Sequence, residues 1–346
     1  LKAALRQSNL LALSEHAEDA ALIFSLPNGE SLIQSVDAFP ALVSDPWLNA
    51  RLTALHACSD IWASGATVSS VQPVITLPAV SQDLQQELLV QILKGIQSAL
   101  DPQLAQIIGG HTLESRAVIP QSITMGIAIA LTVNGQIPCS QFRWGKKGLQ
   151  PGDNIILSRA IGSGVLFAAA MNGNVSSSDM DLALSRMSTS QHLLVNSLLK
   201  TKQSSLVHAC TDITGFGLLG HLGEMLTSSN SIRMKNDLPP LKITLDAERI
   251  PVFQGALDLL GRGFSSTLSP SNRFFWKLFE TTAHSPALFE LSLGKINLGS
   301  EKYKNIMEII VDPQTCGPLA LACPPELTIP LVRKGPWQSI ATVELL

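Results

Sequence analysis

The sequence of 346 residues contains few charged and few aromatic side chains. Charged residues make up 15% of it and aromatic residues 5%, with a single tyrosine. Its 24 Lys and Arg residues nearly balance its 27 Asp and Glu residues. This balance gives no general attraction to nucleic acid or to an anionic membrane surface. We therefore expect neither nucleic acid nor a membrane among the partners of the protein.

Paired cysteines and long apolar runs are also missing. The five cysteines are odd in number and form no CxxC pair: Cys58, Cys139, Cys210, Cys316 and Cys323. This favours a reduced, intracellular protein over a disulfide framework or a zinc site. The longest apolar stretch, residues 123–133, is shorter than the ~20 residues that a membrane span needs. We expect it to be a buried strand, and the protein to be cytoplasmic.

Familiar enzyme signatures are absent as well. The sequence has no protein-kinase set, no GxSxG and no HExxH, and neither of its glycine turns at 107–112 and 159–165 fits the Walker A or the GxGxxG pattern. A P-loop or Rossmann enzyme is therefore disfavoured. What the chain does have is 45% hydrophobic residues, enough for a large core, and a length that suggests two domains.

A break at residues 134–153 divides the chain. This segment is rich in Gly, Pro and polar residues and has no hydrophobic periodicity, so we expect domains at 1–140 and 141–346. Local patterns predict a hairpin in 20–39 around Asn28-Gly29, because this dipeptide suits a tight hairpin turn. They also predict helices at 1–16, 49–66, 81–100 (with Ser81 as N-cap) and 178–200, and a strand–turn–strand unit at 306–323.

Four aspartates stand in an unusual context: Asp19, Asp37, Asp60 and Asp212. Each follows or lies within apolar residues, with no Lys or Arg within three positions. A single such aspartate is more often a helix or turn cap, but an unpaired buried carboxylate is costly. Four together favour convergence on Mg²⁺, which takes a few carboxylates and completes its octahedron with water and phosphate oxygens. This predicts phosphate chemistry on a nucleotide.

Two glycine turns give weaker support. The turns at 107–112 (IIGGHT) and 159–165 (RAIGSGV) let backbone N–H groups approach an anion, although each alone is more often a tight turn. In the first turn His111 follows Gly109 and Gly110. The spacing supports a phosphate contact and a turn-capping role for His111 about equally.

Two thiols and two lysines lie near these motifs in the sequence. Cys58 and Cys210 each precede an aspartate by two residues, so on strands their thiols would face the same space as the acids. A role as a small buried apolar residue is favoured for both. Lys146 and Lys147 could neutralise phosphate, but we expect them in a solvated loop.

Two further motifs stand out beside the IIGGHT turn: TDITGFGLLGHL at 211–222 and DPQTCGPLALA at 312–322. They resemble the hallmark segment and the DPQTSGG motif of the selenophosphate synthetase (selenide, water dikinase) family, and IIGGHT resembles the GGH loop of that family. GLQPGDNIILSRAIGSGV resembles its interdomain PGD segment and glycine turn. AEDAALI, SVDAF and DPWLNARLTALHACSD match in order. The similarity runs from about Asp19 to the C-terminus.

The resemblance implies an α/β (α+β) chain with the two-domain fold of the aminoimidazole-ribotide synthetase-like superfamily, with mixed sheets covered by helices. It implies an enzyme that cleaves ATP to AMP and phosphate while making selenophosphate from selenide. The first domain would bind ATP and metal and form a homodimer, and the second would be the synthetase-like domain.

The resemblance also assigns site residues. Asp19, Asp60 and Asp212 match magnesium-binding aspartates, and Asp37 matches an ATP-contacting aspartate. The expected nucleotide set is Asp37, Asp60, Gly109, Gly110 and His111. The family's catalytic Cys (or selenocysteine) and Lys belong to a glycine-rich segment that would precede Leu1, so no catalytic residue is assigned within the sequence.

The chain departs from the family pattern in places. Glu18 replaces the first Asp of a pair, His56 stands where Asn is common, Arg159 where Lys is frequent, and Cys316-Gly317-Pro318 replaces Ser-Gly-Gly. Two alternatives stay open: another ATP-using member of the superfamily, such as thiamine-monophosphate kinase, or a homologue without the catalytic loop that only binds nucleotide or a partner. Release of AMP rather than ADP would distinguish selenophosphate synthesis from the first alternative. The sequence upstream of Leu1 would distinguish it from the second.

Overall fold

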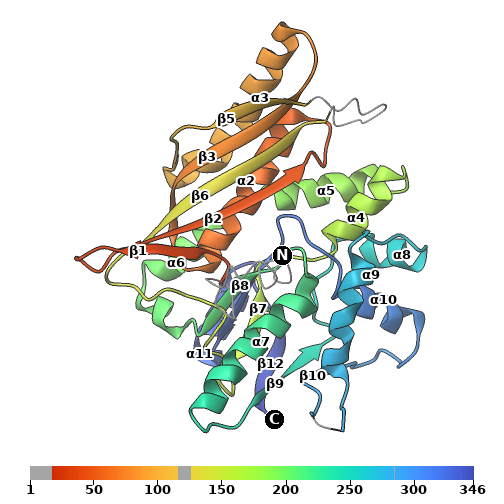
Figure 1. Ribbon diagram of the computed structural model, residues 1–346. Coiled ribbons are helices and arrows are strands. Elements are labelled where there is room, and N and C mark those ends of the chain that lie inside the picture. The colour runs from red at the N-terminus through yellow and green to blue at the C-terminus, as the bar shows by residue number, and fades with distance from the viewer. Residues whose placement is uncertain (1–17, 116–125, 284) are drawn as a thin grey trace.

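The computed structural model describes residues 18–115, 126–283 and 285–346 (Figure 1). The helix expected at 1–16 and the first residues of the strand expected at 123–133 lie outside this part. The strands are β1 (Ala21–Ser25), β2 (Ser31–Pro40), β3 (Thr67–Pro78), β4 (Gln106–Ile107), β5 (His111–Ser115), β6 (Ala128–Ile137), β7 (Asn154–Leu157), β8 (Ala209–Asp212), β9 (Leu241–Asp246), β10 (Phe289–Ser292), β11 (Leu319–Cys323) and β12 (Gln338–Leu345). The α-helices are α2 (Pro46–Ala63), α3 (Gln82–Leu100), α4 (Ser163–Met171), α5 (Ser177–Met187), α6 (His192–Leu199), α7 (Gly217–Lys235), α8 (Ala256–Gly261), α9 (Ser269–Asn272), α10 (Glu301–Ile309) and α11 (Pro325–Lys334).

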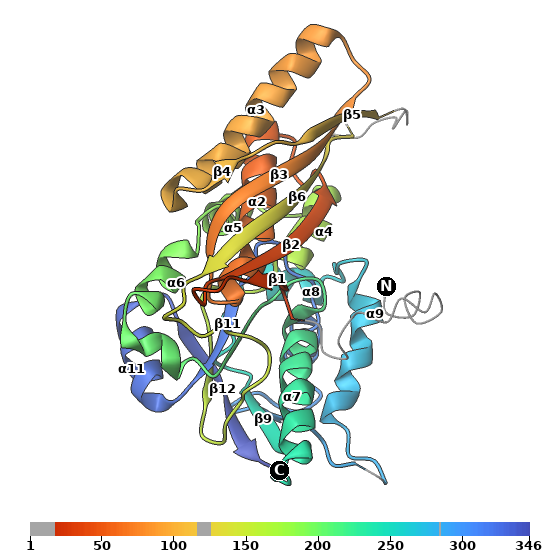
Figure 2. The same cartoon turned by 60° about the vertical axis from the view of Figure 1, so that its left-hand side comes forward.

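The first half of the chain forms a mixed sheet. In the described residues its order is β1-β2-β6-β3-β4, and β5 also pairs with β3. Strands β2, β6 and β3 are antiparallel, whereas β4 and β5 run parallel to β3. Helix α2 packs against β2 and β6 and against α3, and Figures 1 and 2 show both helices on one side of the sheet. We call the other side, which carries the exposed Val36 and Val74, the open face.

The second half of the chain forms another mixed sheet, with the order β10-β9-β12-β7-β11-β8 in the described residues. Helix α7 packs against β8 and β9, and α11 packs against β7 and β12. Strands β8 and β11 are buried at every position. Strand β8 also contacts α2, so the end of this sheet meets the helix layer of the first one. The mixed sheets with their helices confirm the expected fold class.

Several predicted elements are present. The hairpin is formed by β1 and β2, with Gly29 at φ 88° and the Glu30 N–H bonded to Asn28 Oδ1. Helix α2 begins earlier than expected because Asp45 Oδ1 accepts the Leu48 N–H at 2.9 Å. Ser81 is the N-cap residue of α3, although its side chain makes no capping hydrogen bond. None of the described helices combines the length and apolar character needed to cross a membrane.

Two local predictions are wrong. The helix expected at 178–200 is broken into α5 and α6, because Gln191 turns inward and donates to Gly317 O at 3.0 Å. The first strand expected in 306–323 is instead the end of helix α10, which Ser300 caps by accepting the Tyr303 N–H. Ile306 and Ile309 lie three residues apart and are both buried, which fits a helix face rather than a strand.

Candidate metal and nucleotide site

Three of the four predicted aspartates meet where the end of the second sheet reaches α2. Asp19 lies just before β1, Asp60 lies in the last turn of α2, and Asp212 ends β8. One carboxylate oxygen from each lies within 4.8 Å of the other two. We call these three residues the acid cluster. Segments that are far apart in the sequence thus bring together the hard oxygen ligands that Mg²⁺ prefers.

A hydroxyl group orients each carboxylate of the acid cluster. Ser59 Oγ donates to Asp212 Oδ2, and Ser35 Oγ donates to Asp60 Oδ2. Thr211 Oγ1 donates to Asp19 Oδ1 at 3.2 Å. Ser59 and Thr211 each adjoin one acid in the sequence but bind an acid of another element. The three elements are therefore held together at the site through these crossed hydrogen bonds.

The positive charge near the acid cluster does not balance the negative charge of its carboxylates. Burial raises the pKa of Asp19 to about 7; the nearby Lys146 opposes this shift and Asp212 adds to it. Burial also raises the pKa of Asp60 well above its usual range, and the negative charges of Asp212, Asp37 and Asp19 raise it further. Each of these shifts means that the charged form is disfavoured in the cluster as it stands. A bound divalent cation would favour the charged forms, so the donor set fits such an ion.

Asp37 lies beside the acid cluster rather than within it. Its side chain is on the helix-covered side of β2, and Asp37 Oδ2 lies 3.9 Å from His56 Nε2. Burial raises its pKa; His56 opposes the shift and Asp212 adds to it. His56 Nδ1 accepts the backbone N–H of Cys316 at 3.0 Å. Two positions that depart from the family pattern, His56 and Cys316, thus contact each other and link the DPQTCGP loop to Asp37.

Lys146 contradicts the expectation of a solvated loop. Its side chain is 7% exposed, and its ammonium lies 2.7 Å from Asp19 Oδ1 and 2.9 Å from Glu224 Oε2. Burial lowers its pKa, but the two carboxylates more than offset this and raise the pKa above its usual value. Lys147 has a 36% exposed side chain, 3.5 Å from Glu18. Only one of the two lysines therefore reaches the acid cluster.

The GGH loop lies apart from the acids. His111 pairs with Val74 in the sheet, so its side chain is on the open face, whereas Asp37 is on the opposite, helix-covered face. At Gly110 a Cβ would lie 2.6 Å from Pro73 O, so the glycine allows β5 to approach β3 closely. Within one chain the sheet separates His111 from the acid cluster.

The two thiols near the acids are buried. Cys58 lies on helix α2, where residues i and i+2 do not share a face, and Gln103 Nε2 lies 3.8 Å from its sulfur. Burial raises the pKa of Cys58 to about 12 and also raises that of Cys210. Both side chains are fully buried, as the interpretation of them as small apolar residues predicts.

Sequence reasoning missed the groups that support the acids. These are Ser35, Ser59, Thr211, Glu224 and the buried state of Lys146. The adjacent pairs Ser59-Asp60 and Thr211-Asp212 were a usable signal, because a hydroxyl beside an acid on two elements suggests reciprocal support. No signal in the sequence indicates the contacts of Lys146 and Glu224, which lie 78 residues apart.

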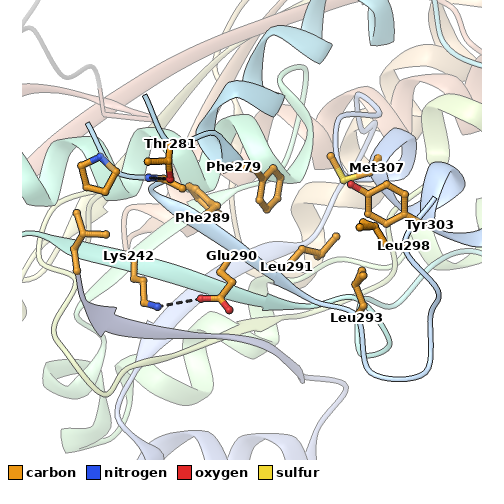
Figure 3. A pocket seen from close by; sticks show the side chains of 13 residues that line it. Lys242, Phe279, Thr281, Phe289, Glu290, Leu291, Leu293, Leu298, Tyr303 and Met307 are labelled. Carbon is orange, nitrogen blue, oxygen red and sulfur yellow. Dashed lines mark hydrogen bonds and ion pairs between the residues drawn. The ribbon is translucent and has the colours of Figure 1, made fainter. Parts of the chain in front are cut away.

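A separate pocket lies at β10 (Figure 3). It has a volume of about 500 Å³ and an apolar lining that includes Phe279, Phe289 and Tyr303. Lys242 and Glu290 form an ion pair of 3.0 Å at its side (Figure 3). None of the predicted site residues lines this pocket.

Comparison with known families defines the class of protein. Residues 17–137 match the N-terminal domain of AIR synthase related proteins, and residues 150–327 match the C-terminal domain of the same proteins. The chain belongs to this family. Thiamine monophosphate kinase from Aquifex aeolicus has the same fold, with a TM-score of 0.63 at 16% identity over 99% of this chain and 93% of that chain. The hydrogenase maturation protein HypE in complex with ATP gives 0.59 at 17% identity over 99% and 84%.

Within this family the chain is similar to proteins named selenide, water dikinase. The one from Nitratidesulfovibrio vulgaris (strain DP4) is 28% identical over 90% of this chain and 76% of the relative. Those from Pelobacter propionicus and Clostridioides difficile (strain 630) are 28% and 27% identical, over 92% and 94% of this chain and 79% and 81% of the relatives. These relatives confirm the resemblance to selenophosphate synthetase and the expectation of a kinase-type enzyme that uses ATP.

Proposed function

We propose that the protein makes selenophosphate from selenide and ATP. The carrying observation is the convergence of Asp19, Asp60 and Asp212 in a chain whose relatives are selenide, water dikinases. In this reaction ATP gives up two phosphoryl groups and becomes AMP. One phosphoryl group is transferred to selenium, and the other is transferred to water and leaves as phosphate.

In this proposal the acid cluster holds Mg²⁺. Bound there, Mg²⁺ supplies positive charge against the triphosphate, which is the main electrostatic need of phosphoryl transfer. The chain itself orients the three carboxylates, which the hydroxyl groups of Ser59, Ser35 and Thr211 hold in place. The nucleotide is assigned to Asp37 and Asp60 on one side and to Gly109, Gly110 and His111 on the other.

The proposed reaction is tested by its products. The full-length protein is incubated under anaerobic conditions with ATP, Mg²⁺ and selenide, and nucleotides are separated by chromatography while ³¹P NMR follows phosphate and selenophosphate. We expect AMP, phosphate and selenophosphate in equal amounts, and only when selenide is present. ADP as the product, or AMP release that ignores selenide, would instead point to another member of the family.

We also propose that residues 1–140 form a homodimer through the open face, and that residues 141–346 form the second domain. Val36 is 65% exposed and Val74 is 41% exposed on the open face, and they pair with the small Thr132 and Ala130 of β6 on the same side. Such a surface is typical of a protein interface. A second copy packed there would also bring His111 of each protomer into the interface.

The dimer proposal predicts that Val36→Glu yields a monomer. The change places a charge in the centre of the proposed apolar interface, where it would be buried without a partner, so association should weaken by at least about a hundredfold. Sedimentation velocity measures the oligomeric state. Val90→Glu is the matched control, because Val90 lies on α3 and is 38% exposed away from the open face. An unchanged sedimentation coefficient for Val36→Glu would place the interface elsewhere.

A further inference from the structure

We infer that Lys146 competes with the divalent cation for Asp19 and thereby sets how tightly the nucleotide-free protein binds metal. The inference rests on the proposed function of the acid cluster and adds a residue to it. Its basis is the position of one buried ammonium between two carboxylates, 2.7 Å from Asp19 and 2.9 Å from Glu224.

The fold holds the backbone of Lys146 in place. Cys210 N donates to Gly145 O at 2.9 Å, and Lys146 N donates to Glu18 Oε2 at 2.9 Å. Two residues before Lys146, Trp144 packs over Gly65, where an added Cβ would come within 2.7 Å of the indole ring. The lysine therefore enters the acid cluster from a fixed point, unlike a lysine on a mobile surface loop.

Lys146 occupies a ligand that the metal needs. Its ammonium and the Thr211 hydroxyl both lie at Asp19 Oδ1. A metal ion on this carboxylate would lie a few ångströms from the ammonium and repel it, in a buried site where such repulsion is poorly screened. Metal binding and the contact between Lys146 and Asp19 thus oppose each other.

Glu224 provides a second position for the ammonium. It lies on α7, its Oε2 is 2.9 Å from the Lys146 ammonium, and its side chain is 27% exposed. When metal takes Asp19, Lys146 can keep its contact with Glu224 and remain charged. It then stays next to the acid cluster as a cation that is no longer neutralised by Asp19, placed to face an incoming phosphate.

The test measures Mn²⁺ binding by EPR, with the metal alone and neither ATP nor selenide present. Lys146→Met should bind Mn²⁺ about tenfold more tightly, since a repelling charge beside the ligand is removed. Glu224→Gln should bind it several-fold more weakly, because Lys146 is then held more firmly on Asp19. Lys147→Met is the matched control and should resemble the wild type. A purely structural lysine predicts the reverse for Lys146→Met, with weaker metal binding and lower stability.

The coupling between the two residues is the sharper test. If Glu224 acts through Lys146, then Glu224→Gln should have little effect in a Lys146→Met background. An effect of Glu224→Gln that is equal in both backgrounds would overturn the inference. Should Lys146→Met fail to fold, the Glu224→Gln variant decides, and unchanged Mn²⁺ affinity for it is the overturning result.

These outcomes are separable from the proposed reaction. If the Mn²⁺ affinities change as expected while the wild type releases no AMP with selenide, the inference stands and the proposed reaction fails. If AMP is released with selenide but Lys146→Met binds Mn²⁺ like Lys147→Met, the inference alone fails.

Discussion

Asp212→Asn is expected to lower selenide-dependent AMP release by about a thousandfold or more, because a metal ligand loses its charge. Asparagine has the size of aspartate, and its amide oxygen can still accept the Ser59 hydroxyl. What the variant lacks is one of the three carboxylates of the acid cluster. The measurement is AMP formed per unit time at saturating ATP, Mg²⁺ and selenide.

The same variant should remain folded, and this makes the result interpretable. Among the charged groups near Asp60, Asp212 contributes most to the rise in its pKa. Removing the charge of Asp212 therefore relieves repulsion, so the metal-free variant should melt at or above the temperature of the wild type. Mg²⁺ should raise the melting temperature of the wild type but not that of the variant, because ligands stabilise only the state that binds them.

Asp246→Asn is a suitable control for this experiment. Asp246 ends β9 and forms an exposed pair with Arg249 at 3.1 Å, in the second sheet but outside the acid cluster. Its loss should leave AMP release near the wild-type rate. Normal turnover by Asp212→Asn would mean that the acid cluster is not the metal site of the reaction.

The acid residues of the site could be found in the sequence because their context was physically odd. An aspartate among apolar residues without a nearby Lys or Arg needs a partner from elsewhere, and three of the four do meet in space. The hairpin at Asn28-Gly29 could be found for a similar reason, since the turn chemistry is local. Features that depend on one or two neighbouring residues were therefore predictable.

The residues that support the acid cluster could not be predicted from such local patterns in the sequence. Lys146 looked like part of a short basic loop, and only the packing of that loop against β8 buries it beside Asp19. The run at 306–311 resembled a strand because a short apolar run fits both the two-residue period of a strand and the 3.6-residue period of a helix. The helix begins at its N-cap residue Ser300, which lies outside this run. The assignment of His111 to the nucleotide stays a prediction, and its position on the open face follows from the pairing of β5 with β3, which the sequence does not show. The burial of Lys146 and the position of His111 thus depend on contacts between distant segments.

Two glycines, Gly215 and Gly217, closely follow Asp212 in the segment 211–222, and their surroundings differ. Gly217 has φ +69°, and a Cβ on it would lie 2.7 Å from the carbonyl carbon of Val311 and 2.9 Å from its Cα and O. Helix α7 therefore starts in direct backbone contact with the segment that leads into the DPQTCGP loop, and Leu219 N donates to Ile310 O at 2.8 Å. Gly215 has no heavy atom within 4 Å of the equivalent position.

This contrast predicts that two substitutions only two residues apart change the free energy of unfolding by very different amounts. Gly217→Ala should lower the free energy of unfolding by about 2–5 kcal/mol, since a left-handed conformation costs about 1–2 and overpacking about 1–3. Gly215→Ala should change it by less than about 0.5 kcal/mol, the usual range for an exposed site. Denaturant unfolding, followed by circular dichroism, measures both. Equal stability of the two variants would show that the close approach of α7 to Val311 is not what requires glycine at position 217.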